Sequence, residues 1–261
     1  MLRLAKLDYA NSSEPEFNDS SESIFIEEFL EVFNSHIKGR WLPTSGAGSR
    51  AVGETFEAAF NVARNNSSGP DWRDLEFKCS LEKTARSGRP KGLFLKEPSW
   101  VDGTKNLNDR VLRYGYPDDL GRPACFQHVR IKPNKHGLAL RPAYESGRLD
   151  LIHNDVSIAF WDLDHIETVL RKKLKNTIFA RARSLGTGAE QHFQYTRVRY
   201  CSEPAAHRFL TCIEEGTAWV EVRMGPRNSR DTKNKNFGCQ FRVLDSVIGE
   251  IFGRTKVLVT G

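Results

Sequence analysis

The stretch from Gly69 to Lys78 constrains the fold of this chain more than any other. It reads Gly-Pro-Asp-Trp-Arg-Asp-Leu-Glu-Phe-Lys, so that an aspartate precedes a short extended run. Side chains alternate between the faces of a strand, which puts Glu76 and Lys78 on one face and Phe77 on the opposite, apolar face. Asp71 lies before a tight turn and can fold back beside Glu76. We therefore expect a strand–turn–strand unit that gathers two carboxylates and an ammonium group.

These residue types suit the hydrolysis of a phosphodiester bond, as in the active site of a metal-dependent nuclease. That reaction needs a nucleophile at neutral pH and stabilisation of charge on the phosphoryl oxygens, and a hard dication supplies both. Mg²⁺ is usually held by one or two protein carboxylates together with waters. Asp71 and Glu76 would bind the metal, and Lys78 would orient or deprotonate the attacking water. Asp74 is the alternative first ligand, and a solvated charged strand face is the non-catalytic alternative.

The segment before this unit predicts a helix over residues 51–63, entered from a loop rich in Gly and Ser. Its apolar residues recur with helical period, and they are Val52, Phe56, Ala59, Phe60 and Ala63. Ser49 is the expected N-cap. Glu57 lies at the edge of the apolar stripe, where it could reach the carboxylates of the following unit. Turn-forming residues at 65–70 then end the helix.

The chain resembles the MvaI/BcnI group of type II restriction endonucleases, which is related to the mismatch-repair nicking enzyme MutH. The motifs that carry the resemblance are Gly53-Glu54-Thr55-Phe56-Glu57, Asn65-Asn66, Pro70-Asp71 and Leu75-Glu76-Phe77-Lys78. A looser similarity continues through residues 92–98, 134–140, 220–224 and 237–243. The resemblance implies that Asp71, Glu76 and Lys78 form the catalytic set. It also implies that Glu57 is the helix glutamate that supports the metal site.

The resemblance further implies an α/β fold with a PD-(D/E)XK nuclease core, in which a mixed sheet is flanked by helices. A second, DNA-recognition lobe is expected, with a DNA cleft between the two. We expect a mobile polar tail over residues 1–20 and a mainly catalytic lobe over 21–185, with an insertion at about 101–150. Residues 186–261 are expected to be mainly the recognition lobe, and either lobe can be discontinuous along the chain.

Periodicity and turn signals predict the remaining elements. Helices are expected at 21–38, 164–174, 205–215 and 244–252. Strands are expected at 71–80, 91–96, 125–132, 137–142, 156–161, 177–183, 192–201, 217–224 and 239–243. The strands at 125–132 and 137–142 are expected to form a hairpin, and residues 101–123 a loop or small insertion.

A basic loop from Gly225 to Asn236 is the expected DNA contact, because it contains almost nothing apolar. Its candidate DNA-binding residues are Arg227, Asn228, Arg230, Lys233 and Lys235. Arg223 and Arg242 lie in the flanking strands and are candidates for reading bases, since Arg can bind guanine O6 and N7 bidentately. The alternative is a charged hairpin that touches only phosphate, or nothing.

The composition agrees with a polyanionic partner. The formal net charge of the 261 residues is +6, which favours phosphate contacts and counterion release. The chain shows neither a signal peptide nor a window of membrane-spanning length, so we expect a cytoplasmic protein of a bacterial or archaeal cell with no membrane partner. The five scattered cysteines lack the spacing of a zinc site.

These observations together predict a Mg²⁺-dependent endonuclease that cleaves double-stranded DNA at a specific sequence, with Mn²⁺ as a substitute for Mg²⁺. A monomer is expected, with a cognate DNA methyltransferase in the same system. The alternatives in the same class are a MutH-like nicking enzyme and a nuclease effector of another defence system. The alternative from a different class is a DNA-binding protein that does not cleave.

Overall fold

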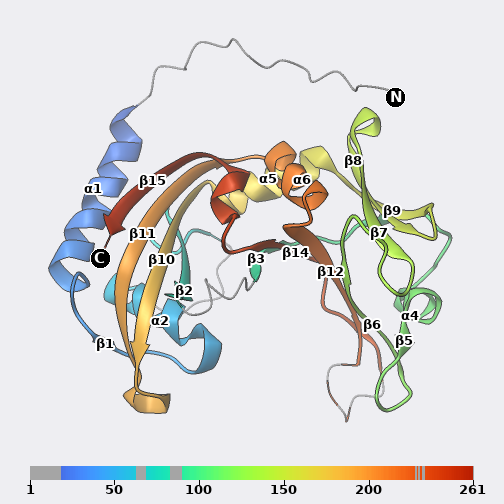
Figure 1. Cartoon of the computed structure of the whole chain (residues 1–261), viewed down its shortest axis with the longest axis horizontal. Coiled ribbons are helices and arrows are strands. Elements are labelled where there is room, and N and C mark those ends of the chain that lie inside the picture. Colours follow the sequence, from blue (N-terminus) through green and yellow to red (C-terminus); the bar gives the residue numbers. More distant parts are fainter. Residues whose placement is uncertain are drawn as a thin grey trace.

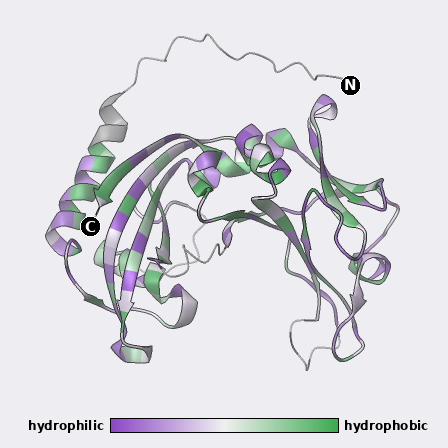
Figure 2. Cartoon of the chain, viewed as in Figure 1, coloured by the Kyte–Doolittle hydropathy of each residue, from purple (hydrophilic) through white to green (hydrophobic). Residues whose placement is uncertain are grey.

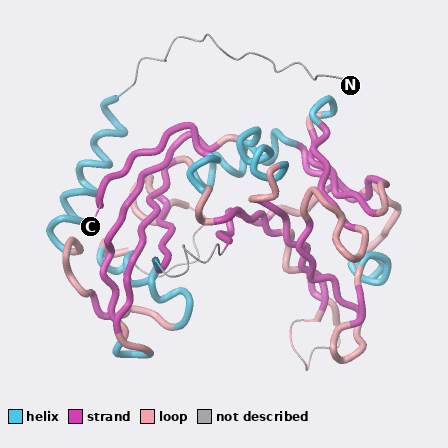
Figure 3. Tube along the Cα trace, in the orientation of Figure 1, coloured by secondary structure: helices cyan, strands magenta, loops and turns pink. Residues whose placement is uncertain are grey.

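A computed structural model describes residues 19–62, 69–82, 90–226, 228, 230 and 233–260 of the chain. It has a mixed α/β fold in which two curved groups of strands stand on either side of a cluster of helices (Figure 1; Figure 3). The α-helices are α1 (Asp19–His36), α2 (Ala51–Ala59), α4 (Leu107–Tyr114), α5 (Leu163–Leu174) and α6 (Ala206–Glu214). The short 3-10 helices are η1 (Gly48–Arg50), η2 (Tyr144–Ser146), η3 (Gly188–Glu190) and η4 (Ile248–Ile251).

The first sheet has the strand order β1-β11-β10-β2, and β15 also pairs with β11. Its strands are β1 (Leu42–Pro43), β2 (Glu76–Leu81), β10 (Asn176–Leu185), β11 (His192–Pro204) and β15 (Phe252–Thr260). β2 runs parallel to β10, and the other pairs are antiparallel. Among the described residues β10 is the only strand partner of β2, which makes β2 an edge strand.

The second sheet has the order β3-β14-β12-β6-β5, with β13 beside β12. Its strands are β3 (Pro90–Leu95), β5 (Tyr116–Pro117), β6 (Pro123–Val129), β12 (Ala218–Gly225), β13 (Lys235–Asn236) and β14 (Gln240–Leu244). A third, antiparallel sheet contains β4 (Ser99–Trp100), β7 (Leu138–Ala143), β8 (Arg148–His153) and β9 (Val156–Asp162).

The strands of the first two sheets are interleaved along the chain. The first sheet takes β2 and β10 from residues 21–185, and it takes β11 and β15 from residues 186–261. The second sheet likewise joins β3 and β6 to β12 and β14. Neither sheet therefore comes from one continuous segment.

Helices α1 and α2 cover one face of the first sheet and bury a cluster of phenylalanines against it. The members are Phe29, Phe33, Phe56, Phe60 and Phe77. Phe29 stacks on Phe60 with ring centroids 5.1 Å apart, and Phe77 meets Phe56 edge-on at 5.1 Å. Purple and green bands follow one another along β10 and β11 in Figure 2, and the middle of β10 is buried on both faces, with Ile178 and Ala180 in this cluster and Phe179 in the larger core. The apolar stripe predicted for the second of these helices is confirmed at Val52, Phe56, Ala59 and Phe60, although α2 ends at Ala59 and the predicted member Ala63 lies outside the described residues.

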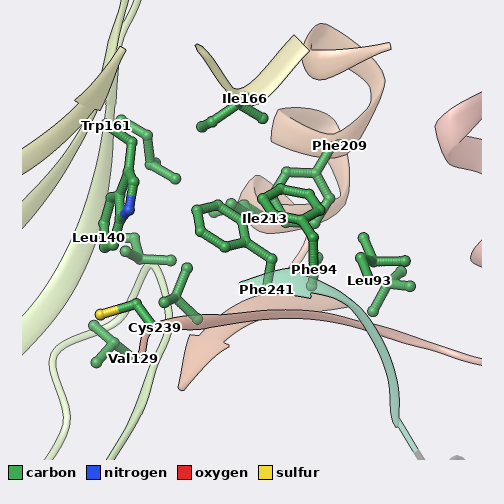
Figure 4. Close-up of a cluster of buried hydrophobic side chains, with 14 of the residues drawn as sticks. Leu93, Phe94, Val129, Leu140, Trp161, Ile166, Phe209, Ile213, Cys239 and Phe241 are labelled. Carbon is green, nitrogen blue, oxygen red and sulfur yellow. The ribbon is translucent and has the colours of Figure 1, made fainter. Parts of the chain in front are cut away.

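The larger core joins the second sheet to the helices α5 and α6. Phe241 of β14 lies at its centre, stacked on Phe94 at 4.5 Å and edge-on to Trp161 at 5.4 Å (Figure 4). Helix α5 contacts both β3 and β11. The same core also includes Phe179 and Phe252 of the first sheet, so it fixes the two sheets relative to each other.

The expected hairpin between the strands at 125–132 and 137–142 is wrong. β6 pairs with β12 and β5, whereas β7 pairs with β8 in the third sheet. The loop between them makes an Asn turn, in which the side chain of Asn134 accepts from the amides of His136 and Leu138. It redirects the chain from one sheet to the other.

Three local predictions also need correction, and the strand β8 was not predicted. Residues 107–114 within the expected loop form α4, capped by Asn106. Residues 148–153 form β8, which turns into β9 through Asn154 and Asp155, both with positive φ. The expected helix at 244–252 is only the short η4 and is followed by β15. Helix α2 has Arg50 rather than Ser49 as its N-cap, with no side-chain cap, because η1 precedes it.

No helix in the described ranges combines the length and apolar character needed to span a bilayer.

Removing the Phe29 ring tests the core under the first sheet. Phe29 is 0% exposed, so Phe29→Ala should lower the free energy of unfolding by about 3–5 kcal/mol. The matched control is Ile24→Ala on the same helix, whose side chain is 51% exposed and whose loss should cost less than about 0.5 kcal/mol. Urea unfolding followed by circular dichroism measures both, and equal losses would contradict the packing described.

Candidate active site

A two-residue turn brings Asp71 back to the start of β2. Trp72 and Leu75 exchange backbone hydrogen bonds of 3.0 and 2.9 Å, and Arg73 between them has a φ of 53°. The returning chain lets the Asp71 carboxylate accept a 2.7 Å hydrogen bond from the amide of Phe77. Asp71 therefore folds back beside β2, as the sequence predicts.

Glu76 and Lys78 lie on the same face of β2 and form an ion pair through Oε1 and Nζ. Their side chains are 17% and 25% exposed, respectively. The pair is therefore withdrawn from bulk water but open enough for a ligand to reach.

Glu57 of α2 completes a group of three acidic side chains that act on one another. Burial raises the pKa of Glu57, and the charges of Asp71, Glu54 and Glu76 raise it further. Burial also raises the pKa of Glu76, although the Lys78 ammonium opposes that shift. These carboxylates thus concentrate negative charge in a partly buried site, and the Lys78 ammonium neutralises only part of it.

The carboxylate of Asp74, the alternative first ligand, is hydrogen-bonded to residues outside the candidate site. Its Oδ2 accepts hydrogen bonds from Asn176 at 2.8 Å and from Lys175 at 3.2 Å, at the start of β10. These bonds direct its carboxylate toward β10, and Asp71 remains as the carboxylate that lies against β2.

The donor set fits a hard dication. Such an ion neutralises carboxylates that have raised pKa values and repel one another. Mg²⁺ commonly binds only one or two protein carboxylates. Within the described residues no group of three or more His, Cys, Asp or Glu side chains converges tightly enough for an all-protein cage. An ion that keeps several waters therefore suits this site better than one that demands a full set of protein ligands.

A second lysine touches the same strand, and no local sequence pattern indicates it. Lys91 of β3 donates a 2.8 Å hydrogen bond from Nζ to the backbone carbonyl of Cys79. Burial lowers the pKa of this ammonium. The contact joins residues from two different sheets, which is why periodicity within either segment carries no trace of it.

Arg223 and Arg242, the candidate base readers, share one face of the second sheet. The register pairs Glu221 with Gln240 and Trp219 with Arg242, and Arg223 follows on the same face of β12. Arg242 Nε lies 2.6 Å from Glu221 Oε1, and Arg223 Nη2 donates to the carbonyl of Phe237 at 2.7 Å. Both guanidinium groups are therefore oriented by fixed acceptors on the sheet face opposite the core.

The described DNA-binding candidates of the basic loop are exposed, and the loop is anchored at two points. Asn228, Arg230, Lys233 and Lys235 are all exposed. Arg122 Nη1 donates to the carbonyl of Asn228 at 2.9 Å, and the side chains of Asn234 and Asn108 are 3.0 Å apart. Arg227, also a candidate, lies outside the described residues.

The sequence pattern of the MvaI/BcnI restriction endonuclease family matches residues 29–252. The fold is similar to a structure of the restriction endonuclease MvaI with its cognate DNA substrate, with a TM-score of 0.71 and 22% identity over 90% of this chain and 98% of that one. A structure of MvaI in the absence of DNA matches with a TM-score of 0.59 and 23% identity over 93% of this chain and 100% of that one. No curated protein sequence matches the chain.

The raised pKa of Glu57 makes a prediction about stability. A carboxyl group whose pKa is higher in the folded than in the unfolded protein stabilises the fold below its unfolded pKa, and this contribution is lost as pH rises through the folded pKa. Glu57→Gln should therefore raise Tm in EDTA at pH 8, and the gain should shrink toward pH 5.

The matched control is Glu31→Gln, on the exposed side of α1, which should leave Tm unchanged at both pH values. Differential scanning calorimetry makes the comparison. A lower Tm for Glu57→Gln at pH 8 would show that the carboxylate is stabilised in the fold, contrary to this account.

Proposed function

The chain belongs to the MvaI/BcnI restriction endonuclease family, and we propose that it is a Mg²⁺-dependent enzyme that hydrolyses double-stranded DNA at a specific sequence. Its class is that of type II site-specific deoxyribonucleases. The observation that carries the proposal is the convergence of Asp71 and Glu76 beside Lys78 at the edge strand β2.

In this proposal Asp71 and Glu76 hold Mg²⁺, or Mn²⁺ in its place, and Glu57 supports them through water. The bound dication supplies a nucleophile at neutral pH and neutralises charge on the phosphoryl oxygens. Lys78 orients or deprotonates the attacking water and donates to the oxygen on which negative charge develops. The products are a 5′-phosphate and a 3′-hydroxyl.

The same proposal gives the second sheet the task of reading the target. Arg223 and Arg242 lie on its face opposite the core, and a guanidinium held by a fixed acceptor keeps spare donors for guanine O6 and N7. The basic loop, with Arg227, Asn228, Arg230, Lys233 and Lys235, contacts phosphates or base edges. The structure of MvaI with its cognate DNA substrate supports this type of ligand for a similar fold.

We assign the catalytic lobe to the first sheet with α1 and α2, and the recognition lobe to the second sheet. One catalytic set per chain is consistent with a monomer that cuts one strand at a time. A cognate DNA methyltransferase would protect the host's own DNA.

A MutH-like nicking enzyme and a nuclease effector of another defence system use the same chemistry and differ in what they leave behind. A binding protein without cleavage would have little reason to bring carboxylates close to phosphate. Their repulsion needs a cation to offset it.

Digestion of a defined plasmid tests the proposed function. The purified protein should cut with Mg²⁺ and remain inactive with EDTA. Sequenced ends should share one short target, since discrete fragments indicate a restriction enzyme and nicks alone a repair-type enzyme. Uniform degradation, or no cutting under any divalent cation, would refute sequence-specific cleavage.

Substitutions in the catalytic set should separate binding from cleavage. Lys78→Ala and Glu76→Ala should keep DNA affinity and lose cleavage by about 10²- to 10⁴-fold, as expected when a group acting on the proton transfer or its metal is removed. The matched control is Asp74→Ala, which alters a neighbouring carboxylate directed toward β10 and should keep most of the activity. Full activity in Lys78→Ala would remove it from the mechanism.

The loop makes an independent prediction about affinity. Exchanging Arg227 and Arg230 for Ala should weaken binding and reduce the slope of log K against log salt by about 2, because each lost phosphate contact changes the slope by ~0.9. Lys256→Ala, an exposed change on β15, is the control for lost charge alone. Fluorescence anisotropy at several salt concentrations measures the slopes, and unchanged slopes would exclude the loop.

A further inference from the structure

The edge of β2 that faces away from β10 carries backbone groups without a strand partner among the described residues. An unpaired edge is normally covered by side chains or loops. Two such groups are covered here: the amide of Phe77 by Asp71 at 2.7 Å and the carbonyl of Cys79 by Lys91 Nζ at 2.8 Å. Residues two apart on a strand present their backbone groups to the same edge, about 7 Å apart. Asp71 and Lys91 thus bracket the strand segment that carries Lys78.

Lys91 reaches this edge from the other sheet. It lies in β3 and is paired with Val243 of β14, so its backbone is part of the second sheet. Its ammonium is withdrawn from water, and a buried cation needs hydrogen-bond acceptors and opposite charge. The Cys79 carbonyl supplies the acceptor, and Asp245 contributes the largest favourable charge.

Asp245 makes a second tie across the same junction. It follows β14 directly and is only 3% exposed. Its Oδ2 lies 3.6 Å from Nη2 of Arg181, which sits on β10 opposite Ser80 of β2. Oδ2 accepts no hydrogen bond from the described residues, so its charge is balanced by the cations around it. A buried ion pair of this kind adds little to stability, and its best-attested use is to specify an arrangement.

We propose that Lys91 is a positioning residue that couples the second sheet to the catalytic strand, with the Asp245–Arg181 ion pair holding the junction from the other side. The proposal rests on the proposed function. When the second sheet binds its target, the position of β3 is transmitted through Lys91 to the Cys79 carbonyl. Lys78 directly precedes Cys79 in β2, so its position depends on the same contact. A misplacement of about 1 Å in a reacting group can cost ~10²-fold in rate.

Lys91→Met tests the coupling in the full chain. The variant should bind plasmid DNA with unchanged Kd in EDTA and cleave it with Mg²⁺ about 10²-fold more slowly under single-turnover conditions. Lys91→Arg should recover most of the rate, because a guanidinium can also donate to the carbonyl and the adjoining cavity of about 260 Å³ gives it room. The matched control is Lys38→Met, which removes the same charge from an exposed position in the turn after α1 and should leave rate and Kd unchanged.

Hydrogen exchange gives a readout that does not depend on cleavage. Amides of residues 76–81 should exchange faster in Lys91→Met than in the wild-type protein, while Lys91→Arg and Lys38→Met match the wild type. If the wild-type protein does not cut DNA but Lys91→Met still shows faster exchange, the structural coupling through Lys91 stands and only the proposed function is refuted. Wild-type cleavage together with an unchanged rate and unchanged exchange in Lys91→Met would overturn the coupling.

A folding defect in Lys91→Met would show as the loss of a cooperative thermal transition. Asp245→Asn then decides the matter, because it keeps the shape of the side chain and removes the charge that faces Lys91 and Arg181. The same slower cleavage at unchanged Kd supports the coupling, and an unchanged cleavage rate overturns it.

Discussion

The hydrogen bond from the Phe77 amide to the Asp71 carboxylate organises the candidate site. β2 has a strand partner on one side only, so this amide would otherwise lie without an acceptor in a partly buried place, which is costly. By accepting it, Asp71 closes the hairpin and comes to rest beside Glu76. The strand's free edge is therefore the means by which a carboxylate from a turn joins a carboxylate from a strand.

Gathering these carboxylates has an electrostatic cost, which the packing of the rest of the protein offsets. Burial and neighbouring carboxylates raise the pKa of Glu57, and burial raises that of Glu76. The phenylalanine cluster beneath α1 and α2 and the larger core around Phe241 hold the elements in place against this repulsion. A cation that relieves the repulsion is then bound by groups already in position, so little ordering is left to be done on binding.

Local patterns predicted those parts of the structure that depend on near neighbours. The helical stripe through Phe56, the alternation in β2 and the return of Asp71 all follow from spacing of a few residues. The local turn favoured Asp71 over Asp74, but the hydrogen bond that directs Asp74 away could not be predicted locally, because Asn176 lies in another strand. Lys91 was missed for the same reason, and β15 because its partner β11 is distant in sequence. The hairpin predicted across residues 133–136 is wrong because β6 pairs with β12, which is distant in sequence, and β7 pairs with β8.

The interleaved order of the strands limits how proteins of this shape can acquire new targets. The chain passes from β11 of the first sheet through β12 and β14 of the second, and then returns to β15 of the first. A single crossover between two homologous genes within that stretch would exchange strands of both sheets and mismatch their shared packing. Divergence by point substitution on the face of the second sheet opposite the core avoids this mismatch in packing. Chimeras would have to transplant several short segments together.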